Sequence, residues 1–69
     1  MTYTQAIRQE GINITGELPN RWAGKTFHGN TFYMEIAQTL GIKFTLYING
    51  VKRAAATDFK TVIGLIKNN

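Results

Sequence analysis

A chain of 69 residues, 43% of them hydrophobic and only one of them proline, has the composition of a small folded domain rather than of a disordered segment. The lack of cysteine excludes disulfides, thiolate metal sites and a thiol nucleophile. Eight Lys and Arg against four Asp and Glu give a net charge of +4, which favours polyanionic partners. We therefore expect a single domain over residues 1–69.

The sequence contains no apolar run of the length needed to span a membrane. Its first residues also lack the basic start and apolar middle of a signal peptide. We therefore expect no membrane partner and a cytoplasmic location.

The first twenty residues predict a short helix followed by a strand or extended arm. Thr2 and Gln5 have the spacing of a capping box, and Gly11 is placed to end the helix. Residues 12–15 alternate apolar and polar side chains, as in a strand. Pro19-Asn20 then predicts a turn.

A first hairpin is predicted around Gly29-Asn30, which suits a two-residue turn. The strands would be residues 24–28 and 31–37, with Phe27 opposite Phe32.

A second hairpin gives the clearest pattern. Residues 43–48 alternate strictly, and Asn49-Gly50 favours a type I′ turn. This register places Ile48 opposite Val51 and Tyr47 opposite Lys52. The side chains expected to face the core are Phe44, Leu46, Ile48 and Val51.

The last segment changes to helical spacing. Its apolar positions are Phe59, Val62, Ile63 and Ile66. Thr57 or Asp58 can cap the start of this helix, and Gly64 suggests a close approach to a strand. We expect an α+β fold, an antiparallel meander of three to four strands with an amphipathic C-terminal helix on one face, which the short N-terminal helix can join.

Gly24-Lys25-Thr26 matches the last three residues of a phosphate-binding loop. Such a loop needs an earlier glycine, but that position is Pro19, which has no N–H group. The motif is also followed by a predicted hairpin rather than a helix. We therefore interpret Gly24-Lys25-Thr26 as the start of a strand, with Lys25 reaching past the sheet edge, and expect no nucleotide hydrolysis.

Catalytic and metal-binding groups are sparse. The chain has one histidine, His28, and four scattered carboxylates, at Glu10, Glu17, Glu35 and Asp58. General acid–base catalysis and metal coordination both need such groups close together. We expect no catalytic site, no metal and no cofactor, and a solvated His28 at a hairpin tip.

The sheet face away from the C-terminal helix is the candidate binding surface. It should carry Thr26, His28, Tyr33, Glu35, Lys43, Thr45, Tyr47 and Lys52. Tyrosines between lysines can stack on bases while the lysines neutralise phosphates. Two other interpretations stand beside this one: these residues are simply good strand formers, or the N-terminal segment covers the face and packs Trp22 against the tyrosines.

Two further features have both a structural and a binding interpretation. Trp22, next to Arg21, is either a core residue or an anchor for a base or a protein partner. Lys52-Arg53 is followed by Ala54-Ala55-Ala56, small residues that either let another surface approach or pass under the helix.

Three pieces of residues 32–68 form a pattern of strand, basic strand after a glycine turn, and helix start: Tyr33 to Ile36, Gly50-Val51-Lys52-Arg53 and Phe59-Lys60-Thr61. In these pieces the segment resembles the three-strand-plus-helix DNA-binding domains of phage and transposon tyrosine integrases and of plant ethylene-response factors. The resemblance implies that outward strand side chains enter the major groove. Here these side chains would be Tyr33, Lys43, Thr45, Tyr47 and Lys52.

Two functional hypotheses follow. One is a non-enzymatic module that binds DNA or RNA through the basic and aromatic sheet face. The other is a small protein-binding module, such as a phage-type inhibitor of a host factor, anchored by Trp22, Tyr33 and Tyr47. The sequence leaves open the choice between DNA and RNA, any sequence specificity and the oligomeric state.

Overall fold

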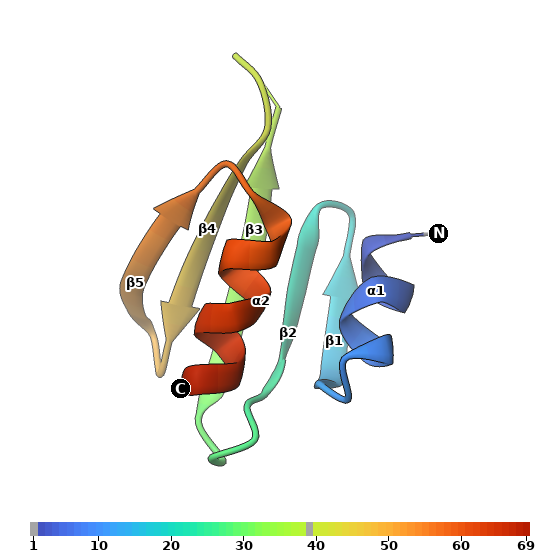
Figure 1. Ribbon diagram of the computed structural model, residues 1–69, viewed down its shortest axis with the longest axis vertical. Coiled ribbons are helices and arrows are strands. Elements are labelled where there is room, and N and C mark those ends of the chain that lie inside the picture. The colour runs from blue at the N-terminus through green and yellow to red at the C-terminus, as the bar shows by residue number, and fades with distance from the viewer. Residues whose placement is uncertain (1, 39) are drawn as a thin grey trace.

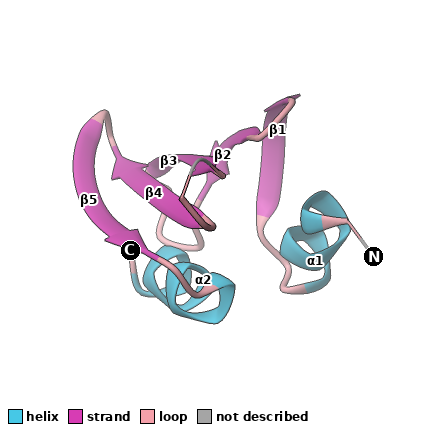
Figure 2. Ribbon diagram, turned by 90° about the horizontal axis from the view of Figure 1, so that it is seen from above, coloured by secondary structure: helices cyan, strands magenta, loops and turns pink. Residues whose placement is uncertain are grey.

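Five strands run in chain order across one antiparallel sheet in the computed structural model, which describes residues 2–38 and 40–69 (Figure 1). The strands are β1 (Asn13–Leu18), β2 (Arg21–Lys25), β3 (Thr31–Ala37), β4 (Lys43–Ile48) and β5 (Val51–Ala56). The helices are α1 (Tyr3–Gln9) and α2 (Phe59–Asn68). Figure 2 shows both helices on the same side of the sheet, and we call the opposite side the outer face.

The predicted α+β meander with a C-terminal helix on one face is confirmed. The sheet has one strand more than the upper number expected, because residues 13–18 pair with β2, with an irregularity between Ile14 and Gly16, rather than forming a loose arm. The N-terminal helix is also confirmed, since Thr2 and Gln5 form the capping box that the sequence indicated. Neither helix is long and apolar enough to cross a membrane.

The first predicted hairpin is wrong in its register. Lys25, not Phe27, is the last paired residue of β2, and it lies opposite Thr31. The five-residue loop is closed by Thr26, whose backbone N–H donates to the Asn30 carbonyl oxygen at 2.8 Å. The Thr26 hydroxyl in turn accepts from the Asn30 N–H at 3.1 Å. Because Thr26 provides these bonds, Phe27 leaves the sheet and is 55% exposed.

The packing around Gly24 favours the observed register of β2 and β3. Gly24 lies opposite Phe32 and is buried between β1 and β3. A Cβ atom at this position would lie 1.9 Å from the Asn13 carbonyl oxygen and 2.8 Å from the Phe32 ring. The glycine of Gly24-Lys25-Thr26 is therefore a packing residue within a strand. The motif ends β2 rather than starting a strand, and Thr26 lies in the following loop, so the expected strand start is wrong although no phosphate loop forms.

The second hairpin has the predicted pairs, Ile48 opposite Val51 and Tyr47 opposite Lys52. Its turn residue Asn49 has a φ of 52°, as a type I′ turn requires. Two details differ from expectation. The register shifts next to Tyr47, so that Arg53 is an extra residue at a β-bulge. Val51 is 68% exposed rather than buried, because it begins an edge strand at the turn, where no other described element covers it.

The core lies between the inner sheet face and the two helices. Its buried members are Ile7, Ile12, Trp22, Phe32, Met34, Ile36, Phe44, Leu46, Val62, Ile63 and Ile66. The predicted apolar stripe of α2 is confirmed, with Phe59 partly buried against the same cluster. Asp58 is the N-cap residue of α2, but its carboxylate accepts from the Thr61 hydroxyl rather than from a backbone N–H.

The expected contact of Gly64 with a strand is wrong. Nothing in the described chain lies within 4 Å of the position that its Cβ would occupy. Gly64 instead lines a groove between α1 and α2, together with Ala6 and Ile63. The ion pair between Lys67 and Glu10 joins the two helices beside this groove.

Candidate nucleic-acid interface

Two tyrosines occupy the middle of the outer face. Alternation along β3 buries Phe32, Met34 and Ile36, so Tyr33 points to the other side of the sheet. The register between β3 and β4 then places Tyr33 opposite Tyr47. Their ring centroids lie 5.6 Å apart with the planes tilted by 48°. Both tyrosines are half-buried, because each ring packs against the other while one side of the pair faces solvent.

A row of cross-strand partners continues from this pair in both directions. Tyr47 lies opposite Lys52 on β5, and Tyr33 lies opposite Ala23 on β2. The aromatic pair thus has a cation on one side and a small side chain on the other. Next to Ala23, the outer face is hollowed by a cavity of about 140 Å³. It is lined by Gly16, Glu17, Leu18, Arg21, Trp22, Ala23 and Tyr33.

The neighbouring row contains the carboxylate of the outer face. Glu35 lies opposite Arg21 on β2 and opposite Thr45 on β4. Its Oε2 atom accepts a long hydrogen bond, 3.4 Å, from the Tyr33 hydroxyl. Although Arg21 is its cross-strand neighbour, Glu35 forms no ion pair within the residues that the structure describes.

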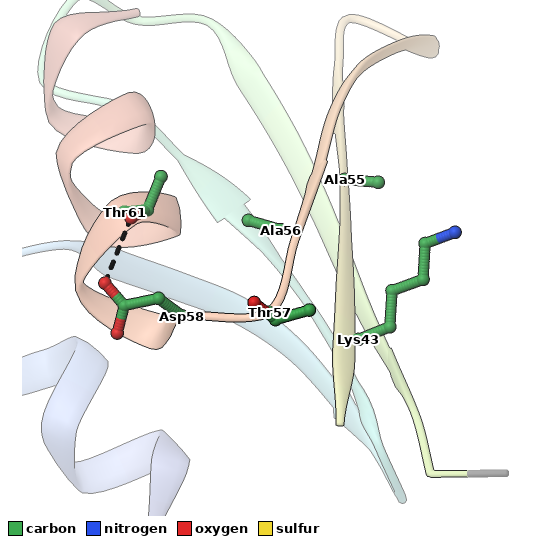
Figure 3. Close-up of a pocket in the computed structure, with 6 residues that line it drawn as sticks. All are labelled: Lys43, Ala55, Ala56, Thr57, Asp58 and Thr61. Carbon is green, nitrogen blue, oxygen red and sulfur yellow. Dashed lines mark hydrogen bonds between the residues drawn. The ribbon is translucent and has the colours of Figure 1, made fainter. Parts of the chain in front are cut away.

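Two more cations lie on the outer face at opposite ends of the sheet. Lys25 ends β2, and its Nζ donates to the Thr31 hydroxyl at 3.2 Å. Lys43 begins β4 opposite Ala37. Figure 3 shows the Lys43 side chain pointing away from Asp58, although both residues line the same crevice at the start of α2. Lys43 is therefore directed to solvent rather than to that carboxylate.

The charges are distributed unevenly between the two sides of the molecule. Within the described residues, the outer face has four cations, Arg21, Lys25, Lys43 and Lys52, and one anion, Glu35. Charges on the helix side balance, with Arg8, Lys60 and Lys67 against Glu10, Glu17 and Asp58. The exposed Arg53 lies at the bulge of the edge strand. The whole net positive charge of +4 thus belongs to the outer face and its β5 edge.

The structure brings most of the predicted binding residues together. Those on the outer face are Arg21, Tyr33, Lys43, Thr45, Tyr47 and Lys52, with Arg53 at its edge. Two other predicted members of this face are elsewhere. Thr26 is buried in the loop after β2, and His28 is an exposed residue of the same loop. Their displacement follows from the corrected register of the first hairpin.

Trp22 does not lie with the tyrosines. It is 6% exposed on the inner sheet face, where its indole N–H donates to the Thr4 hydroxyl at 2.9 Å. Its ring also meets Tyr3 edge-on at 5.8 Å. The prediction that the N-terminal segment covers the outer face with Trp22 against the tyrosines is therefore wrong, and the indole surface is not accessible as an anchor.

The three alanines after Arg53 are divided between the two faces. Ala54 lies opposite the buried Leu46, and Ala56 packs against the core beneath α2. Ala55 is exposed on the outer face. The interpretation of a strand passing under the helix is thus confirmed for the first and third alanines.

Apart from Arg21, sequence reasoning missed the contribution of β2 and β1 to the outer face. Leu18, Ala23 and Lys25 belong to this face, and none of them was expected there as a binding residue. The signal was present in the alternation of residues 21–25 around a buried Trp22. This alternation can be recognised only when the strand is known to begin at Arg21.

Chemical groups suited to metal binding do not converge in the part of the chain that the structure describes, where no three His, Asp or Glu side chains form a cluster. No protein-family model matches the sequence, and neither the curated proteins nor the solved structures contain a significant match to it.

Proposed function

We propose that the protein is a small non-enzymatic module that binds nucleic acid through its outer face. The observation that carries this proposal is the Tyr33–Tyr47 pair, at the centre of a sheet face that neither helix covers and on which cations outnumber anions. Aromatic rings stack on bases of any sequence, and Lys and Arg neutralise phosphates. The outer face offers both groups within one row of partners.

The positions of the cations support this function. Lys52 adjoins the tyrosine pair on one side, and Arg21 lines the cavity next to Ala23 on the other. A nucleic-acid strand that crosses the sheet would place its bases over the tyrosine rings and its phosphates near Lys52 and Arg21. Each contacted phosphate steepens the salt dependence, by about −0.7 in the logarithmic slope for single strands and about −0.9 for B-DNA.

The test is a titration of labelled DNA and RNA at low and at raised salt, measured by fluorescence anisotropy. Wild-type protein is expected to bind at low salt and to weaken steeply as salt rises. Lys52→Ala should flatten the salt slope, whereas Lys60→Ala, on the helix side, should leave it unchanged. Absence of binding to every nucleic acid at low salt would contradict the proposal.

A specific observation favours the second candidate, a protein-binding module. Leu40 is fully exposed and Ile42 is 45% exposed in the connection between β3 and β4. Figure 1 shows the segment that leads into β4 starting beyond the end of the sheet. Exposed apolar side chains on a protruding loop are suited to a protein partner, such as the host factor of a phage-type inhibitor.

The two candidates differ in their response to nuclease and salt. A protein partner held by Leu40 and Ile42 should be retained from lysate after nuclease treatment and at raised salt. Leu40→Ser should abolish this capture and leave nucleic-acid titrations unaffected.

A further inference from the structure

We propose that the outer face selects single-stranded over duplex nucleic acid, and that Glu35 gives it a preference for an unpaired guanine beside Tyr33. This inference rests on the proposed function and names the substrate class of the same face. It follows from the width of the sheet, from the tyrosine pair with its neighbouring cavity, and from the absence of an ion pair at the Glu35 carboxylate in the described chain.

The width of the sheet disfavours a duplex. Four inter-strand spacings of about 4.8 Å make a five-stranded sheet about 19 Å across. The major groove of B-DNA is about 12 Å wide and admits a helix or a two-stranded ribbon. The Tyr33–Tyr47 pair lies on β3 and β4, the third and fourth strands in this order, with strands on either side. These rings therefore cannot reach paired bases without the neighbouring strands meeting the phosphate backbone.

The tyrosine pair suits unpaired bases. The two ring centroids, 5.6 Å apart, offer adjoining surfaces for two successive bases of an extended strand. The cavity of about 140 Å³ lies on the β2 side of Tyr33, away from Tyr47, and its charged lining residues are Arg21 and Glu17. A base beside Tyr33 can thus settle against apolar side chains while its phosphate stays near a cation.

The Glu35 carboxylate is positioned to contact the edge of that base. It is half-buried, and its hydrogen bond from the Tyr33 hydroxyl is long, at 3.4 Å. Because it forms no ion pair within the described chain, its oxygens retain most of their capacity to accept hydrogen bonds. A carboxylate repels phosphate. The favourable partner for Glu35 in a bound nucleic acid is therefore a base whose edge donates hydrogen bonds.

Guanine fits this acceptor best. Its Watson–Crick edge presents two adjacent donors, N1–H and the N2 amino group, which match the two oxygens of one carboxylate. Adenine and cytosine each offer an amino group next to an acceptor. Thymine and uracil present one N–H between two carbonyl oxygens, which the carboxylate repels. We therefore expect affinity to fall in the order guanine, then adenine and cytosine, then thymine and uracil.

The experiment compares labelled oligonucleotides by fluorescence anisotropy at low salt. The strands are a short oligothymidine, the same strand with one central guanine, adenine or cytosine, and a duplex of equal length. Wild-type protein should bind the guanine strand about tenfold more tightly than the oligothymidine, as a bidentate contact gives. It should bind every single strand more tightly than the duplex.

Two variants test the role of the carboxylate. Glu35→Gln replaces one acceptor oxygen with an NH2 donor and removes the charge, so the preference for guanine should fall while oligothymidine binds more tightly. Glu10→Gln makes the same change in net charge at the end of α1, on the other side of the sheet, and should keep the preference. Thermal unfolding of both variants checks that the fold is retained.

The outcomes separate this inference from the function on which it rests. Duplex binding as tight as single-strand binding, or an unchanged base preference in Glu35→Gln, would overturn the inference while nucleic-acid binding itself stands. If wild-type protein binds none of the oligonucleotides, both are overturned.

Discussion

The indole N–H of Trp22 donates a 2.9 Å hydrogen bond to the hydroxyl of Thr4, and both side chains are buried. This contact joins β2 to α1 across eighteen positions of the chain. Tyr3, next to Thr4, packs against the same indole and against Phe44. The polar atom of the tryptophan is thus satisfied within the core, which keeps α1 on the inner side of the sheet.

Thr4→Val should destabilise the protein by about 1–3 kcal/mol, because it leaves the buried indole N–H without an acceptor while preserving the shape of the side chain. Urea unfolding measures the change. Thr15→Val, at an exposed position of β1, is the control and should stay within about 0.5 kcal/mol of wild type. Equal effects at the two positions would show that the hydrogen bond does not stabilise the fold.

Gly24→Ala should be strongly destabilising, by about 1–3 kcal/mol or more, because the added Cβ would overlap the Asn13 carbonyl oxygen. Gly16→Ala is the matched control on the neighbouring strand, where nothing in the described chain lies within 4 Å of the Cβ position. Thermal unfolding compares the two variants.

Lys25→Ala should change neither stability nor ATP affinity, since Lys25 is an exposed strand residue rather than part of a phosphate loop.

Phe44→Ala should cost about 3–5 kcal/mol and Leu46→Ala about 2–5 kcal/mol, because both side chains are buried beneath the helices. Either loss is comparable with the total stability of so small a domain. Thr45→Ala, on the outer face between them, should cost far less. Circular dichroism during denaturation gives the comparison, and similar tolerance at all three positions would contradict the register of β4.

Tyr47→Ala should weaken nucleic-acid binding by about 1–3 kcal/mol, the contribution of one stacked base. Lys52→Ala should act differently, by reducing the salt slope by about one phosphate contact. Titrations at two salt concentrations distinguish the effects. Tyr47→Phe is the control for stacking and should bind like wild type, and loss of binding in that variant would assign the contribution to the hydroxyl instead.

Local features of this fold could be predicted because their causes lie within a few residues. The strict alternation of residues 43–48 and the turn at Asn49-Gly50 fix the second hairpin without help from the rest of the chain. The capping box of Thr2 and Gln5 begins α1, and helical spacing defines the buried stripe of α2. Strand alternation is likewise sufficient to place the two tyrosines and Lys52 on one face of the sheet.

Tertiary structure decided which strand register is adopted and which sheet face stays open. The Gly29-Asn30 dipeptide allowed a tight turn, but the close approach of Asn13 and Phe32 to Gly24 and the bonds of Thr26 select a five-residue loop. Similarly, a tryptophan beside an arginine fits either face of a sheet. The hydrogen bond from Trp22 to Thr4 holds α1 on the same side as α2, so neither helix covers Tyr33 and Tyr47, because partners distant in the chain set that choice.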